Sequence, residues 1–390
     1  MRIAFITHYT SLYGANRSLL DLIDGLERHG VSSSVVCPEE GDMTAALRGR
    51  GVPVATMPVE MWMSGCSSPD GVFGHIRRCL GQGRRAARSL YLNVRVLPAF
   101  VRQLRTWDVD VVYTNSSVIP IGALAAKWLA LPHIWHLREF GDLDYGRHPD
   151  WGTIVFNRVI RSADALVTNS EAVRSHVLNG AAYRRAYVIY NGIAWEADFD
   201  RLYELVQGKR TRQERYTFAL VGYLRPSKGQ ETAIRALAVV ADQCPDVRLL
   251  IVGGGDTSQL ERIASQLGVA DNVKFWGYIP NPYEAYLAAN AALMCSKHEA
   301  MGRVTAEAMS ACRPVIGYDD GGTPEIVEHE HTGLLYRGGP EALATCMNRF
   351  IENPAWAEQL GENGWHVARE RYSIETYADS VYQVLQTLPI

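Results

Sequence analysis

Two glutamates lie close together in the sequence of the C-terminal half, where a predicted strand, a loop and a predicted helix follow one another. Glu299 and Glu307 are separated by seven residues in the segment KHEAMGRVTAEAMSACRPVIG, residues 297–317. Glu299 follows a predicted strand and Gly302 allows close backbone approach, while Glu307 falls early in a predicted helix whose first N–H groups favour an anion. One carboxylate can then reach a sugar and the other a ribose diol. The alternative is a helix with ordinary capping and surface glutamates.

Two cations follow another predicted strand, in the segment VGYLRPSKGQE, residues 221–231. The strand ends at Gly222, and Arg225 and Lys228 precede a predicted helix. Arginine can bind phosphate oxygens in a bidentate manner and lysine acts as a point charge, so both suit a diphosphate. Fixed cations stabilise the charge that a leaving nucleoside diphosphate gains as its bond breaks. Taken alone, the two residues also fit solvated loop cations.

The N-terminal half offers a histidine and a glycine-containing loop. The segment HIWHLREFG, residues 133–141, is placed after a strand-like position, and His136 is the candidate to reach a donor sugar. His133 is an equal candidate on composition, and a lone histidine is more often structural. Gly14 stands in the loop between the first predicted strand and the first helix, where phosphates bind in such sheets.

Two Asp-x-Asp sequences raise the question of a metal. Residues 108–110 precede a predicted strand rather than follow one, and residues 142–144 lie in a loop near glycine. Both are interpreted as ordinary loop acids, and no required metal is expected.

Parallel sheets must position these residues, because short apolar runs alternate with longer amphipathic segments. The predicted strands are residues 2–7, 33–38, 109–115, 165–170, 187–192, 217–224, 247–255, 273–279, 291–296 and 314–318. The predicted helices include residues 18–29, 229–243, 257–267 and 303–312. This order predicts an α/β protein with two doubly wound Rossmann-like domains that face a central cleft.

Three regions are expected. Residues 1–200 form an N-terminal Rossmann-like domain, residues 201–372 form a C-terminal Rossmann-like domain, and residues 373–390 form a helix that crosses back to the first domain. The family resemblance described below implies that the first domain is the acceptor side and the second binds the nucleotide sugar. The polar segment 195–216 is interpreted as the connection between the domains.

Composition excludes several classes of protein. The 390 residues carry a net charge of -3, so no nucleic-acid partner is expected. The N-terminal sequence lacks a basic region followed by a long apolar run, and no apolar stretch reaches the roughly 20 residues of a membrane helix. The scattered cysteines fit a reducing cytoplasm.

In combination and in this order, the motifs resemble the GT-B-fold retaining glycosyltransferases of family four, the glycosyl transferases of group 1. The resemblance runs through nearly the whole chain. It rests on the glutamate pair, the two cations, NSEAV at 169–173, YNG at 190–192 and GGTPEIV at 321–327.

The resemblance implies a role for each residue. Glu307 would bind the ribose, Glu299 the donor sugar, and Arg225 and Lys228 the diphosphate, with His136 near the reaction centre. Backbone at Gly14, Gly222, Gly302, Arg303 and Val304 would hold phosphates or sugar, and backbone near Tyr278 would read the base. It implies transfer with retention, by front-face attack, from a nucleotide sugar and without another cofactor. A UDP-sugar is favoured, and a GDP-sugar is the alternative.

Two positions depart from the family. Its first loop often reads Gly-Gly-x-Glu, whereas this chain has Gly14-Ala15-Asn16-Arg17. Arg303 stands where the family commonly has an apolar residue, and it is interpreted either as a phosphate or acidic-sugar contact or as a surface residue.

An arginine-rich segment sets the first domain apart. Residues 71–107 contain no aspartate or glutamate and carry eight arginines, namely Arg77, Arg78, Arg84, Arg85, Arg88, Arg95, Arg102 and Arg105. Apolar residues between them make a basic amphipathic pattern that suits an anionic membrane surface or an anionic acceptor. The alternative is a solvated helix pair. A cytoplasmic location is expected, at the inner face of the membrane if this segment binds lipid.

Other functions remain open at this stage. The acceptor is a saccharide, a lipid-linked saccharide or an anionic polymer. A nucleotide-sugar epimerase shares the two-domain architecture, and a non-catalytic polyanion-binding protein would use the arginine segment alone. A dinucleotide oxidoreductase fits poorly, because VGGGD at 252–256 lacks the G-x-G-x-x-G spacing.

Overall fold

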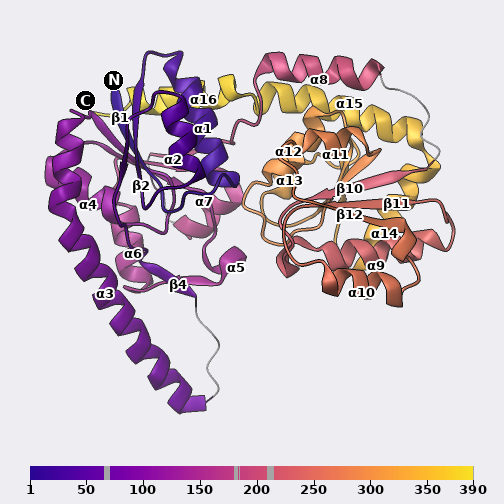
Figure 1. The fold of residues 1–390 in the computed structure, drawn as a ribbon, viewed down its shortest axis with the longest axis horizontal. Helices are drawn as coiled ribbons and strands as arrows, with labels where there is room; N and C mark the ends of the chain where they lie inside the picture. Colours follow the sequence, from indigo (N-terminus) through magenta and orange to yellow (C-terminus); the bar gives the residue numbers. More distant parts are fainter. Residues whose placement is uncertain (66–70, 180–182, 184, 209–214, 390) are drawn as a thin grey trace. The chain divides into compact units, whose positions relative to one another are not determined.

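The chain folds into two α/β units. The computed structural model describes residues 1–65, 71–179, 183, 185–208 and 215–389, and for residues 71–80 only the backbone. Unit 1 comprises Met1–Asn191 and Tyr377–Ile390, and unit 2 comprises Gly192–Thr376 (Figure 1). Each unit has its own parallel sheet, so the predicted fold class is confirmed.

Unit 1 is built on a seven-stranded parallel sheet. The strand order is β3-β2-β1-β5-β6-β8-β9. The strands are β1 (Arg2–Ile6), β2 (Ser32–Cys37), β3 (Val54–Thr56), β5 (Val111–Thr114), β6 (His133–Leu137), β8 (Ala165–Thr168) and β9 (Ala186–Val188). A separate antiparallel pair joins β4 (Met63–Gly65) to β7 (Arg147–Pro149). The strand order reverses between β1 and β5, and the carboxyl ends of strands at such a point form a ligand-binding crevice in doubly wound sheets.

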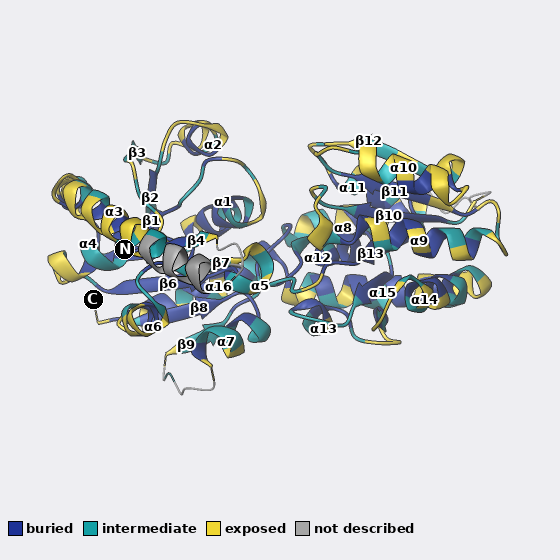
Figure 2. Ribbon diagram, turned by 90° about the horizontal axis from the view of Figure 1, so that it is seen from below, coloured by how far each residue is buried: buried dark blue, intermediate teal, exposed yellow. Residues whose placement is uncertain are grey.

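Helices cover the sheet of unit 1 and bury its apolar strands (Figure 2). They are α1 (Gly14–Glu27), α2 (Asp42–Gly49), α3 (Gly71–Thr106), α4 (Ile121–Leu129), α5 (Asp142–Tyr145), α6 (Thr153–Ile160), α7 (Glu171–Leu178) and α16 (Ile374–Gln386). Tyr377, Val381 and Leu385 of α16 are buried in the same cluster as Ile3 and Phe5 of β1. The last helix is therefore part of the core of unit 1.

Unit 2 repeats the plan with a six-stranded parallel sheet. The order is β12-β11-β10-β13-β14-β15. The strands are β10 (Thr217–Val221), β11 (Arg248–Val252), β12 (Val273–Gly277), β13 (Ala291–Met294), β14 (Val315–Tyr318) and β15 (Gly333–Tyr336). The helices are α8 (Glu196–Gly208), α9 (Gln230–Ala241), α10 (Ser258–Gln266), α11 (Tyr283–Leu287), α12 (Arg303–Ser310), α13 (Thr323–Ile326), α14 (Pro340–Glu352) and α15 (Pro354–Arg371), with a 3₁₀ turn at Pro226–Lys228. The order reverses between β10 and β13, which are neighbours.

The segment interpreted as a connection contains a helix of unit 2. In α8, Phe199, Leu202 and Val206 are buried at a spacing of three and four residues, and α8 packs on α15. The expected boundary at residue 200 falls inside this helix, whereas the units divide after Asn191. The charged residues on the outer face of α8 hid this apolar stripe from the sequence interpretation.

Helix α3 is one continuous element rather than a helix pair. It runs over 36 residues along unit 1 (Figure 1). Leu97, Phe100 and Leu104 are buried on its inner face. Among the described residues, no helix combines the length and the apolarity that crossing a membrane requires.

Loops after three strands of unit 2 lie against one another, and glycines permit this. A Cβ on Gly229, which has φ of +73°, would lie 2.5 Å from the carbonyl oxygen of Cys295. Cβ atoms on Gly321 and Gly322 would meet the backbone of Glu299 and Ala300. The Gly322 N–H donates to the Glu299 carbonyl at 2.7 Å. The loops that follow β10, β13 and β14 therefore hold the predicted site residues in a fixed relation.

We expect Gly229→Ala to destabilise unit 2 by about 1–3 kcal/mol more than Gly268→Ala, because the added methyl group must displace backbone. Gly268 is the matched control, since it has the same φ of +73° and nothing within 4 Å of its Cβ position. Urea unfolding followed by circular dichroism measures both. Equal losses of unfolding free energy in the two variants would contradict the prediction, because they would show that the loops after β10 and β13 move apart for the methyl group without loss of stability.

Candidate functional site

Lys228 and Glu299 form the centre of the candidate site. The Lys228 Nζ lies 2.6 Å from Glu299 Oε2, and their side chains are 32% and 17% exposed. Lys228 ends the 3₁₀ turn after β10, and Glu299 stands in the loop after β13. Since the strand order reverses between β10 and β13, the pair lies at the switch point of the sheet, where such folds bind ligands. A cation and an acid that the sequence predicted for one ligand are thus in contact.

The charge of Glu299 depends on Lys228. Burial acts to raise the pKa of the Glu299 carboxyl, but the Lys228 ammonium and hydrogen bonds from Lys228 and Ser296 outweigh it and lower that pKa below its usual range. The carboxylate is therefore ionised at neutral pH and available as an acceptor for sugar hydroxyls. A diphosphate that drew Lys228 away would weaken this ion pair.

Glu307 is held by the residue one helical turn before it. Arg303 Nε donates to Glu307 Oε1 at 2.9 Å, and the two side chains are 14% and 5% exposed. Of the two interpretations of Arg303, that of a surface residue does not fit, because its guanidinium is enclosed and donates to Glu307 and to two backbone carbonyls; that of a ligand contact stays untested. Gly302 caps α12 with φ of +79°, a conformation that glycine adopts without strain. Val304 accepts a hydrogen bond from the Tyr286 hydroxyl through its carbonyl oxygen.

The other predicted residues of unit 2 follow the strands β10 and β12. The Arg225 guanidinium stacks 4.9 Å from the ring of Tyr223, and both residues are exposed. Tyr278 is 64% exposed after β12, and its Cβ lies 3.9 Å from a Cβ position built on Gly254. A Cβ position built on the same glycine lies 3.8 Å from Tyr223 Cε2. Gly222 has φ of +156°, and a Cβ built on Gly253 would overlap the Gly222 carbonyl oxygen, so the loops after β10 and β11 cross closely.

His136 does not follow a strand as expected. It lies within β6, its side chain is fully buried, and Nδ1 is 2.7 Å from the Tyr113 hydroxyl. Burial, and secondly the charge of Arg138, lower its pKa well below the usual range, so the ring is neutral. His133 is also buried and bonds to Thr114 Oγ1 at 2.8 Å. Both rings belong to the interior of unit 1. The predicted phosphate-binding residue of unit 1 that is exposed is Gly14, the first residue of α1.

Sequence reasoning missed a buried arginine of unit 1. Arg138 donates to Asn115 Oδ1 at 2.7 Å, to Asn191 Oδ1, and to the Tyr377 hydroxyl at 2.8 Å. The NSEAV motif serves the same edge, because Asn169 Nδ2 donates to the Arg138 carbonyl. An arginine directly after a buried strand, together with Asn residues after three others, was the available signal.

A second buried group of unit 1 centres on Glu139. Its Oε1 accepts from the Ser116 and Ser117 hydroxyls and from the Ser117 N–H at 2.6–2.7 Å. Burial lowers the pKa of His8 to about 4, against the opposing effect of Glu139. These side chains follow β1, β5 and β6, and the sequence analysis named none of them.

The two Asp-x-Asp sequences have structural partners. Asp108 and Asp110 both pair with Arg2 at the start of β1. Asp142 lies 2.8 Å from His176 Nε2, and Asp144 accepts the Gly141 N–H at 2.8 Å. Among the described residues, no group of three or more His, Cys, Asp or Glu side chains is arranged to hold a metal ion.

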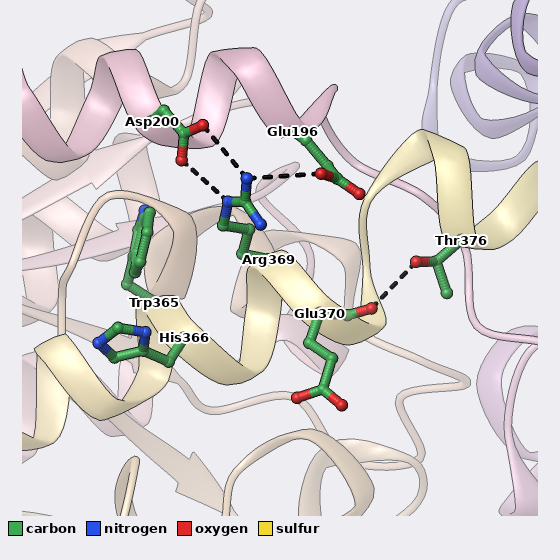
Figure 3. A pocket seen from close by; sticks show the side chains of 7 residues that line it. All are labelled: Glu196, Asp200, Trp365, His366, Arg369, Glu370 and Thr376. Carbon is green, nitrogen blue, oxygen red and sulfur yellow. Dashed lines mark hydrogen bonds and ion pairs between the residues drawn. The ribbon is translucent and has the colours of Figure 1, made fainter.

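A surface pocket of about 570 Å³ lies elsewhere on unit 2 (Figure 3). Arg369 of α15 bonds to Asp200 Oδ1 at 2.9 Å and lies 3.4 Å from Glu196 Oε2. These ion pairs fasten α8 to α15 over Trp365. No residue predicted for the nucleotide site lines this pocket.

Comparison with known proteins identifies the family. The family model described as glycosyl transferases group 1 matches residues 204–367, and that of glycosyltransferase family 4 matches residues 13–196. The chain is 29% identical to an uncharacterised glycosyltransferase of Methanocaldococcus jannaschii over 56% of this chain and 59% of that protein. It is 27% identical to a D-inositol 3-phosphate glycosyltransferase of Corynebacterium urealyticum over 67% of this chain and 66% of that one. The matched part thus spans less than two thirds of each relative.

Solved structures agree on the fold. HepE of Anabaena, solved in complex with UDP and glucose, superposes with a TM-score of 0.74 at 23% identity over the whole of both chains. Sucrose-phosphate synthase of Thermosynechococcus elongatus gives 0.71 at 20% identity, over 99% of this chain and 98% of that one. These neighbours show the GT-B fold, and the two family models, which together match residues 13–196 and 204–367, show that the chain belongs to the glycosyltransferases of group 1 and family 4.

Proposed function

We propose that this protein transfers a sugar from a nucleotide-sugar donor to an acceptor hydroxyl, with retention of anomeric configuration and without a required metal. The single observation that carries the proposal is the contact of Lys228 with Glu299 at the switch point of unit 2. A cation for a diphosphate and an acid for a sugar are adjacent there, as one nucleotide sugar requires. Glu307, in the helix that follows Glu299, is the acid proposed for the ribose.

The proposed chemistry needs little from the protein beyond charge and position. The bond between the anomeric carbon and the diphosphate oxygen breaks, and the acceptor oxygen bonds to the same face of that carbon. The hydroxyl proton passes to the departing phosphate oxygen. Lys228 and Arg225 stabilise the charge on the leaving diphosphate, which is the task a divalent cation performs in other enzymes. Because the described part of unit 1 buries His136, its proposed role is to shape the site from within.

The donor and acceptor classes are inferred from relatives. HepE was solved with UDP and glucose, which favours a UDP-sugar, while a Mycobacterium tuberculosis relative 37% identical over 172 residues is named as GDP-mannose-dependent. That relative is named as a phosphatidylinositol monomannoside mannosyltransferase, and a Rhizobium meliloti relative is named as a lipopolysaccharide core biosynthesis glycosyltransferase, so a saccharide or lipid-linked acceptor is proposed. No described feature favours the epimerase alternative.

Ligand screening tests the function. We expect UDP- or GDP-sugars to raise the midpoint of thermal unfolding, since a ligand that binds only the native state stabilises it. Turnover should require an acceptor and should cease in Glu307→Gln, with product configuration read by NMR. Conversion of the donor to another free nucleotide sugar without acceptor would instead identify an epimerase.

Neutral substitutions at Lys228 and Glu299 should separate the diphosphate-binding role of the lysine from the sugar-binding role of the glutamate. We expect Lys228→Met to weaken UDP binding at least tenfold, because charge-assisted hydrogen bonds to the diphosphate contribute about 1.5–3 kcal/mol. Glu299→Gln should leave UDP binding equal or tighter, since it frees Lys228, yet reduce the preference for UDP-glucose over UDP. Titration calorimetry measures both.

Lys274→Met is the matched control for these two variants, because Lys274 is an exposed lysine of unit 2 outside the proposed site. Unchanged UDP affinity in Lys228→Met would contradict the proposed diphosphate role.

We also propose that α3 docks on an anionic membrane surface. Leu90, Tyr91 and Val94 are 47%, 63% and 52% exposed on its outer face, where apolar residues gain most from contact with lipid. Exposed arginines flank them, namely Arg84, Arg88, Arg95, Arg102 and Arg105. Two nearby acids are Glu60, 3.8 Å from Arg88 Nε, and the buried Asp150, 3.6 Å from Arg85. The side chains of Arg77 and Arg78 lie outside those described.

Vesicle sedimentation tests this docking. We expect binding to vesicles that contain phosphatidylglycerol at low salt, and much weaker binding to pure phosphatidylcholine. Replacing Leu90, Tyr91 and Val94 by serine, or Arg88, Arg95 and Arg102 by glutamine, should reduce it. Glutamine at the unit 2 residues Arg201, Arg235 and Arg262 is the control for net charge. Absence of binding at low salt rules out the docking.

A further inference from the structure

Arg303 joins the proposed ribose acid to the chain that enters unit 2. Beyond its bond to Glu307, its Nη1 donates to the Gly192 carbonyl at 3.0 Å and its Nη2 to the Ile193 carbonyl at 3.1 Å. Three donors of one planar group are therefore directed at three fixed acceptors. Lysine has a single ammonium group and an apolar residue has no donor, so only arginine can donate to all three acceptors from one planar group.

The segment that Arg303 binds is itself rigidly held. The Ile193 N–H donates to the Tyr372 carbonyl and the Ile374 N–H to the Ala194 carbonyl, both at 2.9 Å. A Cβ on Gly192 would lie 2.8 Å from Ile374 Cα, so the two segments pack without a side chain between them. Residues 192–194 therefore provide a firm support for the guanidinium, and through it for the carboxylate.

The carboxylate is left partly free for a ligand. Glu307 Oε1 accepts from Arg303, and no described residue donates to the other carboxylate oxygen. Each oxygen of an ionised carboxylate can accept two hydrogen bonds, so Arg303 leaves room for a diol. A carboxylate that is already oriented loses no rotamer freedom when a ligand binds, so the entropic cost of binding is lower. The gain in affinity applies only to ligands whose hydroxyls bond to this carboxylate.

We propose that Arg303 is a positioning residue that orients Glu307 for the ribose 2′- and 3′-hydroxyls and so sets the preference for ribonucleotide over 2′-deoxyribonucleotide donors. The inference rests on the proposed function. It means that the arginine at position 303, where the family commonly has an apolar residue, helps to determine which nucleotide binds. Arg303 acts through Glu307 and contacts neither the diphosphate nor the sugar.

Titration of UDP and 2′-deoxy-UDP into four proteins tests the proposal. The proteins are the full-length wild type, Arg303→Met, Glu307→Gln and the double variant. The wild type should prefer UDP by about tenfold, the effect of one hydrogen bond to a charged group. Each single variant should lose most of that preference by weakening UDP far more than 2′-deoxy-UDP. The double variant should lose no more, because both residues act as one unit.

Arg235→Met is the matched control. Arg235 and Glu231 form another Arg–Glu pair one helical turn apart in unit 2, but their side chains are 46% and 47% exposed. This variant should keep the wild-type preference. Arg303→Lys, which keeps the charge and can be used if Arg303→Met does not fold, should lose part of the preference.

The titrations distinguish failure of the Arg303 inference from failure of the proposed function. Equal weakening of UDP and 2′-deoxy-UDP in Arg303→Met, or an unchanged preference, overturns the inference and leaves the proposed function standing. A wild type that binds neither UDP nor GDP overturns the proposed function, and the inference with it.

Discussion

A lysine and a glutamate that share one small volume at the switch point of the unit 2 sheet impose the main constraint on that unit. A mostly buried carboxylate is tolerable only if a cation lies close to it, so the loops after β10 and β13 must approach to 2.6 Å at their side chains. That approach leaves no room for Cβ atoms at Gly229, Gly321 or Gly322. The two glycines of the GGTPEIV motif thus allow the loop after β14 to pack on the backbone of the loop that carries Glu299.

The sequence predicted the elements that repeat and the residues that lie beside them in the chain. Buried parallel strands are apolar throughout, so β1, β10 and β11 were recognisable as uninterrupted runs. Lys228 and Glu299 were predicted for one ligand because both follow strands, and carboxyl ends of parallel strands share an edge. Their contact depends on the order of the strands in the sheet, which places β10 beside β13 and which no local pattern in the sequence encodes.

The residues that sequence analysis placed wrongly are those whose surroundings come from distant parts of the chain. His136 reads like a loop residue beside Arg138 and Glu139, yet Tyr113 and Tyr377 enclose its ring. Arg303 reads like a solvated residue in a helix, yet Gly192 and Ile193 accept its donors from 111 and 110 residues away. Neither enclosure has a local pattern, because periodicity reports which side of an element is buried and not what buries it.

Two enclosed arginines, Arg138 and Arg303, bind the residues at which the chain passes from one unit to the other. The polypeptide leaves unit 1 at Asn191 and returns at Tyr377, and Arg138 of unit 1 binds the side chains of both residues. Arg303 of unit 2 binds the carbonyls of Gly192 and Ile193, the next residues along. Each unit thus fixes its own end of the connection by charge-assisted hydrogen bonds, which are stronger than neutral ones. Within unit 2, the Arg303 guanidinium therefore links the entering segment at Gly192 to the proposed ribose carboxylate of Glu307.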